Sequence, residues 1–260
     1  MDEYINMSDD EISKPIYRII GFDRLVRMFQ TKKMTFVKPE KWDDPFETFI
    51  AKTKIYMGSS FLDVGIRKNP HGTCWTRKSV SDAIWRIYSH DKKSVRIKST
   101  PEIICRNIAK GLQDYPKSKV FIGKVEYLTT KQIKEKAKNF TKGVISGDSG
   151  KLVAESLLFK RNSFSHEEEV RVLVIDQDDM SKDGVLSINV DPHEIIQSVL
   201  IDSRSPSELV DVYTNYLKHV LHFNGNVGKS TLYDVPKPMT MKYKMKKKIK
   251  KKIKKKIKYK

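Results

Sequence analysis

Apolar and polar positions alternate most clearly between residues 167 and 175. Every second residue over 170–174 is valine, whereas Glu167, Glu169 and Arg171 fall on the alternate positions. Successive side chains of a strand point to opposite faces. The pattern therefore predicts a strand over residues 167–175, with its valines on a core. Its other face carries two carboxylates and a guanidinium, which fits either the floor of a polar cleft or a salt-bridge ladder on a solvated face.

The same kind of patterning predicts the other elements. Strands with antiparallel neighbours, irregularly mixed with helices, indicate the α+β class: one mixed or antiparallel sheet with flanking helices. We expect the strand over 185–190 to pair with the strand over 167–175. Strands are predicted over residues 15–20, 34–37, 73–76, 94–99, 119–128, 185–190, 195–201 and 231–235, and helices over 23–29, 82–89, 101–112, 130–140, 152–158 and 207–217.

An acidic segment follows the second predicted strand and has two interpretations. Asp43, Asp44 and Glu47 are three carboxylates within five residues, which is compatible with a magnesium site. Helix capping explains the pattern better, because Asp44 fits the N-cap, Pro45 fits the first helical position and Glu47 fits N3 of a capping box. We therefore favour capping and expect no metal.

Composition and charge suggest a single domain with a separate tail. The 260 residues carry a formal charge of +19, but residues 237–260 contain fourteen lysines and no acid, so the rest carries only +5. We predict a loose acidic segment over 1–14, a globular domain over 15–236 and a lysine-rich tail over 237–260. Two cysteines without metal-ligand spacing, no signal peptide and no long apolar run predict a soluble, intracellular protein. Oligomeric state is not predicted.

The tail repeats an apolar residue every fourth position, from Met241 to Ile257, with lysine in nearly every gap. Three roles remain open. The tail could neutralise the phosphates of nucleic acid or another polyanion, lie on an anionic membrane, or serve only as a targeting or low-complexity extension. We favour nucleic-acid association or nuclear targeting.

Two further groups of residues have both a structural and a functional interpretation. Trp85 and Tyr88 are three residues apart on one predicted helix, a spacing typical of ordinary core or rim and also of a stacking site for a planar ring. Arg18 and Arg171 could pair with Glu167 and Glu169 and join two strands.

The glycines near residue 228 do not form a phosphate-binding loop, because the first glycine of that motif is missing.

Several separated fragments together resemble the uncharacterised bacterial and viral family called domain of unknown function 2971. Its most specific pieces here are Asp44-Pro45-Phe46-Glu47 and Glu167-x-Glu169-x-Arg171, and the likeness spans about residues 15–235. The weaker pieces are Ile16-Tyr17-Arg18, Cys74-Trp75-Thr76, Trp85 with Tyr88, and Lys160. The sequence departs from the family at Asp43, where Asn is usual, and also at Trp75, Ser94 and Phe164.

The order of these fragments is also similar to the layout of ADP-ribosyltransferases. That resemblance implies an ADP-ribosyltransferase-like fold, NAD as co-substrate and no metal. It implies that Arg18 binds the pyrophosphate or a ribose, that Thr76 contacts the nicotinamide ribose, and that Trp85 or Tyr88 stacks on nicotinamide. Glu169 would stabilise the positive charge that develops as nicotinamide leaves, and Glu167 would orient or deprotonate the acceptor.

Three functions therefore compete. The first is an ADP-ribosyltransferase or NAD glycohydrolase. The second is a non-enzymatic protein that binds nucleic acid through residues 237–260. The third is a nuclease with a divalent ion on Asp44, Glu167 and Glu169, which is disfavoured because the strand carries Glu-x-Glu where the common nuclease core has a lysine.

Overall fold

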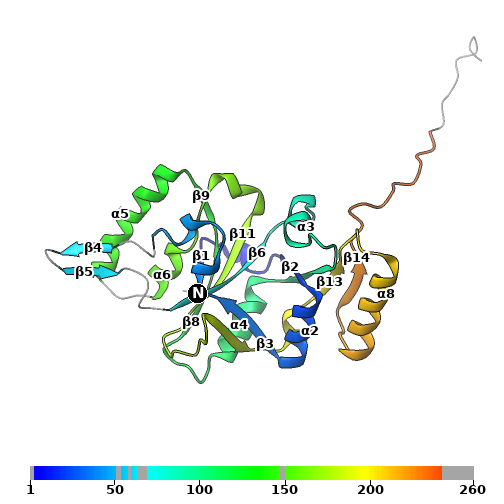
Figure 1. Cartoon of the computed structure of the whole chain (residues 1–260), viewed down its shortest axis with the longest axis horizontal. Coiled ribbons are helices and arrows are strands. Elements are labelled where there is room, and N and C mark those ends of the chain that lie inside the picture. The colour runs from blue at the N-terminus through cyan, green and yellow to red at the C-terminus, as the bar shows by residue number, and fades with distance from the viewer. Residues whose placement is uncertain (1–2, 51–53, 58–59, 64–68, 147–149, 242–260) are drawn as a thin grey trace, which may run out of the picture.

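The computed structural model describes residues 3–50, 54–57, 60–63, 69–146 and 150–241 (Figure 1). Strands and helices are mixed along the chain, and most neighbouring strands run antiparallel. The α+β class predicted from the sequence is confirmed. Among the described residues, no helix is both long and apolar enough to cross a membrane.

A ten-stranded mixed sheet forms the centre of the molecule. Two small additional pairs lie beside it, parallel β9 (Glu126–Leu128) with β10 (Phe159–Arg161) and antiparallel β4 (Lys54–Met57) with β5 (Ser60–Asp63). The main path runs β1 (Tyr4–Ile5), β8 (Lys119–Lys124), β11 (Glu169–Ile175), β6 (Pro70–Thr76), β2 (Ile16–Gly21), β7 (Ser94–Ser99), β13 (Ser198–Ile201) and β14 (Asn226–Lys229), and β3 (Lys33–Val37) with β12 (Val185–Asn189) branches from β6.

The sheet divides along one edge of β6. On that edge β3 pairs only through Val37 with Gly72, and β2 pairs only through Tyr17 with Thr76. The residues between, 73–75, are paired with β11 on the other edge. Strands β2 and β3 therefore diverge from β6, and the division leaves room for side chains and a cavity in the middle of the sheet.

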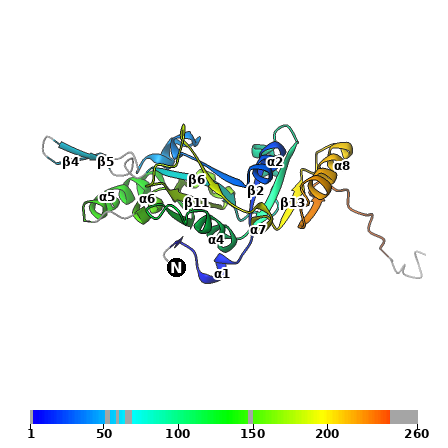
Figure 2. The ribbon, with the colours of Figure 1, turned by 90° about the horizontal axis from the view of Figure 1, so that it is seen from below.

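Helices cover both faces of this sheet. Figure 2 shows α4, α6 and α7 beneath the sheet and α2 above it. The helices are α1 (Asp9–Ile12), α2 (Phe22–Thr31), α3 (Asp82–Tyr88), α4 (Pro101–Gly111), α5 (Thr130–Ser146), α6 (Gly150–Ser156), α7 (Pro192–Ile195) and α8 (Ser207–Asn215), with 3-10 turns η1 (Pro39–Lys41), η2 (Pro45–Thr48) and η4 (Asn162–Glu167) and the π-helical turn η5 (Tyr216–Val220).

The alternation in β11 is confirmed from Glu169 onward. Val170, Val172 and Val174 belong to the largest core cluster, whereas Leu173 and Ile175 pack into a second cluster on the opposite face. The strand begins two residues later than predicted. Residue 167 ends a 3-10 turn and residue 168 has a left-handed backbone with φ of 42°, so the acidic run turns a corner before the ladder starts.

Several pairings differ from the sequence prediction. Strand β12 pairs with β3 and not with β11, so the pairing expected between the strands over 185–190 and 167–175 is wrong. Both edges of β11 are occupied instead by β6 and β8, two long strands that are distant from it in the sequence. The strand predicted over 119–128 is divided between β8 and β9. The residues predicted as a strand over 231–235 form a turn, and β14 forms just before them.

The two ends of the domain are held by specific contacts. Strand β1 pairs with β8, and the Glu11 carboxylate accepts from Lys124 at 2.6 Å, so the described N-terminal residues are ordered against the sheet, unlike the loose segment expected. At the other end, Leu232 packs beside α3. Residues 242–260, most of the predicted basic tail, lie outside the described part of the chain.

Candidate active site

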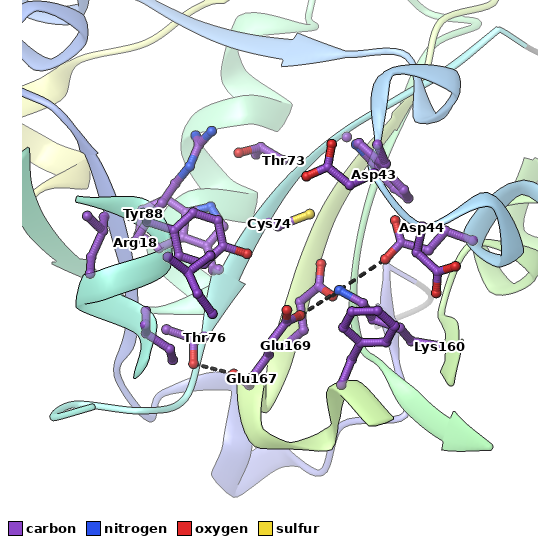
Figure 3. A pocket seen from close by; sticks show the side chains of 18 of the residues that line it. Arg18, Asp43, Asp44, Thr73, Cys74, Thr76, Tyr88, Lys160, Glu167 and Glu169 are labelled. Carbon is purple, nitrogen blue, oxygen red and sulfur yellow. Dashed lines mark hydrogen bonds and ion pairs between the residues drawn. The ribbon is translucent and has the colours of Figure 1, made fainter. Parts of the chain in front are cut away.

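A cavity of about 610 Å³ opens where β2, β3 and β6 diverge (Figure 3). Its volume lies within the usual range of small-molecule sites, about 300–1,000 Å³. The wall comes from β2, α2, β3, η1, η2, β6, α3, β10, η4 and the first residue of β11. Five of the six residues predicted as site residues line it: Arg18, Thr76, Tyr88, Glu167 and Glu169.

Arg18 supplies the basic side of this cavity. It lies on β2, where pairing with β7 fixes the backbone opposite Ile97. Its side chain is half-buried and makes no hydrogen bond or ion pair with any residue that the structure describes. Burial lowers the pKa of its guanidinium, and the ionisable groups close enough to contribute are Cys74, Arg24 and Tyr88, none of which is a carboxylate. Among the described residues, the salt-bridge ladder considered for Arg18 therefore does not form.

Helix α3 brings Tyr88 to the cavity. Ser81 caps the helix by accepting from the Ile84 amide at 3.3 Å. Trp85 is only 1% exposed and packs with Ile84 and Leu232, so it belongs to the core and is not among the residues that line the cavity. Tyr88 is 48% exposed. Desolvation of its hydroxyl, together with nearby Glu167 and Glu169, raises the pKa of Tyr88.

Thr76 ends β6 opposite Glu169 in the strand register. Its hydroxyl donates to the carbonyl oxygen of Glu167 at 2.5 Å and accepts from the amide of Lys78 at 3.0 Å. Thr76 thus fixes the backbone at the corner where the acidic run enters β11. One lone pair of its hydroxyl remains for a ligand.

A buried cluster of charged residues forms the acidic side. Glu169, which is 4% exposed, accepts from the Nε of Arg171 at 2.9 Å and from the ammonium of Lys160 at 3.2 Å. The same ammonium lies 2.5 Å from Glu167 and 3.0 Å from Glu47. Arg171 also donates to Glu47 at 2.8 Å. Three carboxylates therefore share two cations.

Burial and pairing act in opposite directions on these groups. Burial would raise the pKa of Glu169, but Arg171 and Lys160 outweigh it and lower that pKa to about 2. Burial would lower the pKa of Arg171 and Lys160, but the neighbouring carboxylates raise both. For Glu47 burial prevails, and its pKa is raised despite Arg171 and Lys160. Within the cluster, Glu47 is therefore the carboxyl whose pKa shift favours the protonated form.

A second ion pair forms the neighbouring wall. Asp44 accepts from Arg161 at 3.0 and 3.2 Å and from the amide of Phe46 at 3.0 Å. The guanidinium of Arg161 also lies 4.8 Å from the Phe46 ring centroid. Asp44 is the predicted N-cap, but Glu47 does not complete the capping box, because its carboxylate points to the buried cluster. Asp43 is exposed, lines the cavity and has no hydrogen bond or ion pair with the described residues.

Sequence patterns missed three residues of this site. Glu47 was predicted as a cap, Cys74 was noted only beside Thr76, and Arg24 was not considered. Cys74 lies beside Glu169 and hydrogen-bonds to it, and burial raises the pKa of the thiol. Its position two residues before Thr76, on the same face of a strand, could have placed it in the site. No group of three or more His, Cys, Asp or Glu residues able to hold a metal occurs in the described part of the chain.

Residues 84–172 match the family model described as "Protein of unknown function (DUF2971)". The predicted resemblance is confirmed over this region, which includes Tyr88, Lys160 and the Glu-x-Glu-x-Arg run but not Arg18, Asp44 or Thr76. No curated protein matches the sequence.

Among solved structures, the chain is similar to Thermus sp. 2.9 DarT in complexes with carba-NAD+, with NAD+ and with ADP-ribosylated ssDNA. Identities are 12–13%, coverage is 84% of this chain and 94–96% of DarT, and TM-scores are 0.35–0.37. These TM-scores are too low to establish a shared fold or a shared site.

Proposed function

We propose that this cavity binds NAD and that the protein transfers ADP-ribose from NAD to an acceptor or to water. The observation that supports this most directly is the unpaired, half-buried guanidinium of Arg18, which opens on the same cavity as Tyr88 and the carboxylates of Glu167 and Glu169. A buried charge without a partner is costly, so its persistence suggests an anionic ligand.

Arg18 suits the pyrophosphate. A guanidinium presents parallel N–H donors that match two phosphate oxygens, and no protein group competes for them in the described residues. Exposed Arg24 lines the same side and adds a second cation. The positive charges of Arg18 and Arg24 together favour an anionic group bound next to β2.

Tyr88 and Thr76 suit the nicotinamide riboside. The half-exposed ring of Tyr88 offers a face for a planar heterocycle, whereas Trp85 is enclosed in the core, so stacking falls to Tyr88. The remaining lone pair of Thr76 can accept from a ribose hydroxyl.

Glu169 suits the developing positive charge. When the bond between the ribose C1′ and the nicotinamide nitrogen breaks, its electrons leave with nicotinamide, and the ribose becomes oxocarbenium-like. Glu169 stays ionised because Arg171 and Lys160 hold it, so a fixed negative charge faces that carbon. Glu167 lines the cavity nearby and would accept the proton of the attacking nucleophile as the new bond to C1′ forms.

Release of nicotinamide from NAD tests this function, with water and candidate acceptors supplied in turn. Glu169→Gln should reduce the rate by about 100-fold or more, because the fixed charge is removed. Glu168→Gln is the matched control: this adjacent carboxylate pairs with Lys78 and does not line the cavity, so its variant should keep the rate. Equal rates for the two variants, or absence of NAD binding to the wild type, would contradict the proposal.

A second candidate is nucleic-acid association through residues 237–260. It is supported by the positive charge of that stretch. The stretch also begins close to the cavity, because Tyr233, four residues before it, hydrogen-bonds to Asp82 on α3, the helix that carries Tyr88. Removing residues 237–260 should abolish binding that weakens steeply with salt, measured on single- and double-stranded DNA and RNA. Undiminished binding would reject the tail as its cause.

A further inference from the structure

A second cavity, of about 990 Å³, lies beside β8 and close to the described N-terminal residues (Figure 1). Its wall comes from β1, α4, the turn between α4 and β8, the first half of β8, the start of α6 and the end of β11. Its volume is at the upper end of the usual range of small-molecule sites. No described residue lines both this second cavity and the first cavity, at Arg18. Strand β11 begins at the first and ends at the second, which places them about 20 Å apart.

The buried part of the second cavity's wall is mostly apolar. Four residues that line it are apolar and at most 6% exposed: Leu112, Val120, Phe121 and Ile175. The hydroxyl of Tyr4 hydrogen-bonds to the buried thiol of Cys105, and burial raises the pKa of both groups, so both stay uncharged at pH 7. The buried hydroxyl of Ser118 donates to Asp178 at 2.9 Å. A ligand in this cavity therefore meets an apolar surface at its inner end.

Cationic side chains outnumber carboxylates at the second cavity. Four cations line it against two carboxylates, which gives a formal charge of +2. The cations are Arg106, Lys117, Lys119 and Lys151, and the carboxylates are Glu3 and Glu102. Neighbouring Asp178 does not line the cavity, and the charge stays positive if it is included. The side chains of Arg106 and Lys119 make no hydrogen bond or ion pair with any described residue, so both can bind an anion.

Tyr115 adds an aromatic ring to this wall. It lies in the turn between α4 and β8, and its side chain is 38% exposed. The turn is fixed, because the Tyr115 amide donates to the carbonyl of Leu112 at 2.8 Å and its own carbonyl accepts from the Ser118 amide at 3.1 Å. A partly exposed ring on a fixed turn offers a face on which a planar heterocycle can stack.

We propose that the second cavity binds a free nucleoside phosphate. Arg106 and Lys119 would bind the phosphate, and the base would lie between Tyr115 and the apolar wall. Glu102 would accept from a ribose hydroxyl. A phosphate monoester carries about two negative charges, which matches the excess of +2, whereas the carboxylate of a fatty acid carries one. The inference does not depend on the proposed function, because the two cavities are separate.

Calorimetric titration with AMP tests this inference. AMP could also enter the first cavity, so the titration is made on Arg18→Met, in which phosphate binding at the first cavity is weakened. We expect one AMP to bind per chain. Inorganic phosphate, which lacks the ring, and adenosine, which lacks the charge, should each bind at least about tenfold more weakly. Equal affinities for inorganic phosphate and AMP would contradict the nucleotide assignment.

Further substitutions in Arg18→Met assign the bound AMP to the second cavity. Arg106→Gln should weaken AMP binding by about 10- to 100-fold, because charged hydrogen bonds are lost. Lys110→Gln is the matched control: this exposed cation lies one turn later on α4 and does not line the cavity, so AMP affinity should be kept. Ala109→Trp, at an exposed position that lines the cavity, should block it without changing any charge. Urea unfolding checks that each variant is folded.

Two results would overturn the inference: no binding of AMP to folded Arg18→Met, or AMP affinity that neither Arg106→Gln nor Ala109→Trp reduces. Both leave the proposed function intact, because binding of NAD by the wild type is measured at the first cavity. Conversely, AMP binding that depends on Arg106 in a protein that does not bind NAD would support the second cavity and overturn the proposed function alone.

Discussion

Two buried ion clusters in this molecule differ in charge balance and in access to ligand. The first joins Asp202 and Arg204, with contacts of 2.6 and 3.0 Å, and Ser89 donates to the same carboxylate at 2.7 Å. Arg204 also donates to the carbonyls of Trp85 and Ser89 at the end of α3. The second is the cluster around Glu169, whose three carboxylates share two cations.

The difference indicates what each cluster contributes. The Asp202 cluster is neutral, it satisfies the end of a helix and it does not line the cavity, so it is typical of a structural element. The Glu169 cluster sets three carboxylates against two cations, and its three carboxylates and Lys160 line the cavity, where a ligand can reach them. Variants of the two clusters should therefore separate stability from binding.

The largest expected effect on stability comes from Arg171→Met. Arg171 is fully buried and bonds to Glu169, to Glu47 and to the carbonyl of Leu157. Its loss leaves three buried carboxylates, those of Glu47, Glu167 and Glu169, with Lys160 as their one cation among the described residues, so we expect a loss of about 3–5 kcal/mol in the free energy of unfolding. Urea unfolding at pH 7 measures it. A loss below about 1 kcal/mol would show that the cluster contributes little to folding.

The second-largest expected effect is the contribution of the Glu169 carboxylate to the pH dependence of stability. Because its pKa in the folded protein is lowered to about 2, its contribution is present above the ordinary carboxyl pKa and is lost as pH falls from about 4.5 toward 2. The contribution is about 3 kcal/mol at neutral pH. Urea unfolding of wild type and Glu169→Gln should therefore give stabilities that converge on acidification. A constant difference from pH 6 to 2.5 would contradict the lowered pKa.

Asp202→Asn should have a moderate effect on stability and none on ligand binding. The asparagine keeps an acceptor for Ser89, and Arg204 keeps its bonds to Trp85 and Ser89, so we expect a loss of about 1–3 kcal/mol in the free energy of unfolding. Affinity for oxidised NAD should stay within about twofold of wild type. A large loss of affinity with an intact fold would mean that the two clusters do not separate as described.

The sequence predicted the contents of the candidate site better than its boundaries. Glu169 and Arg171 could be anticipated because strand alternation is local, and the valines identify the core face. The division of the sheet at β6 could not, because single-residue pairings with β2 and β3 depend on segments far apart in the chain. A polar cleft was therefore one of two interpretations of the charged face of residues 167–171, and the other residues of its wall were expected only through the family resemblance.

Two misassigned side chains have the same kind of cause. The sequence around Glu47 fits a capping box, so local rules assign its carboxylate to the helix cap. In the structure the carboxylate instead accepts from Arg171 of β11, which is 124 residues away in the sequence. Trp85 and Tyr88 share a helical spacing, but Leu232 covers Trp85 and leaves Tyr88 half-exposed. Local spacing predicts which residues are neighbours on an element, whereas the segments that cover them are set by tertiary packing.

The smallest expected change in stability, and the sharpest contrast with Arg171, comes from Arg18→Met. Arg18 has no partner in the described residues, so its removal breaks no ion pair and relieves the burial of a charge. We expect the free energy of unfolding to stay within about 1 kcal/mol of wild type or to rise slightly. Binding of ADP-ribose, which has the pyrophosphate but no charged ring, should weaken by about 10- to 100-fold. Urea unfolding and calorimetry on the same preparation measure both. Arg18→Lys, which keeps the charge but loses the paired donors, should recover part of the affinity. A strongly destabilised variant would show that Arg18 supports the fold, and unchanged ADP-ribose affinity would show that it does not bind the phosphates.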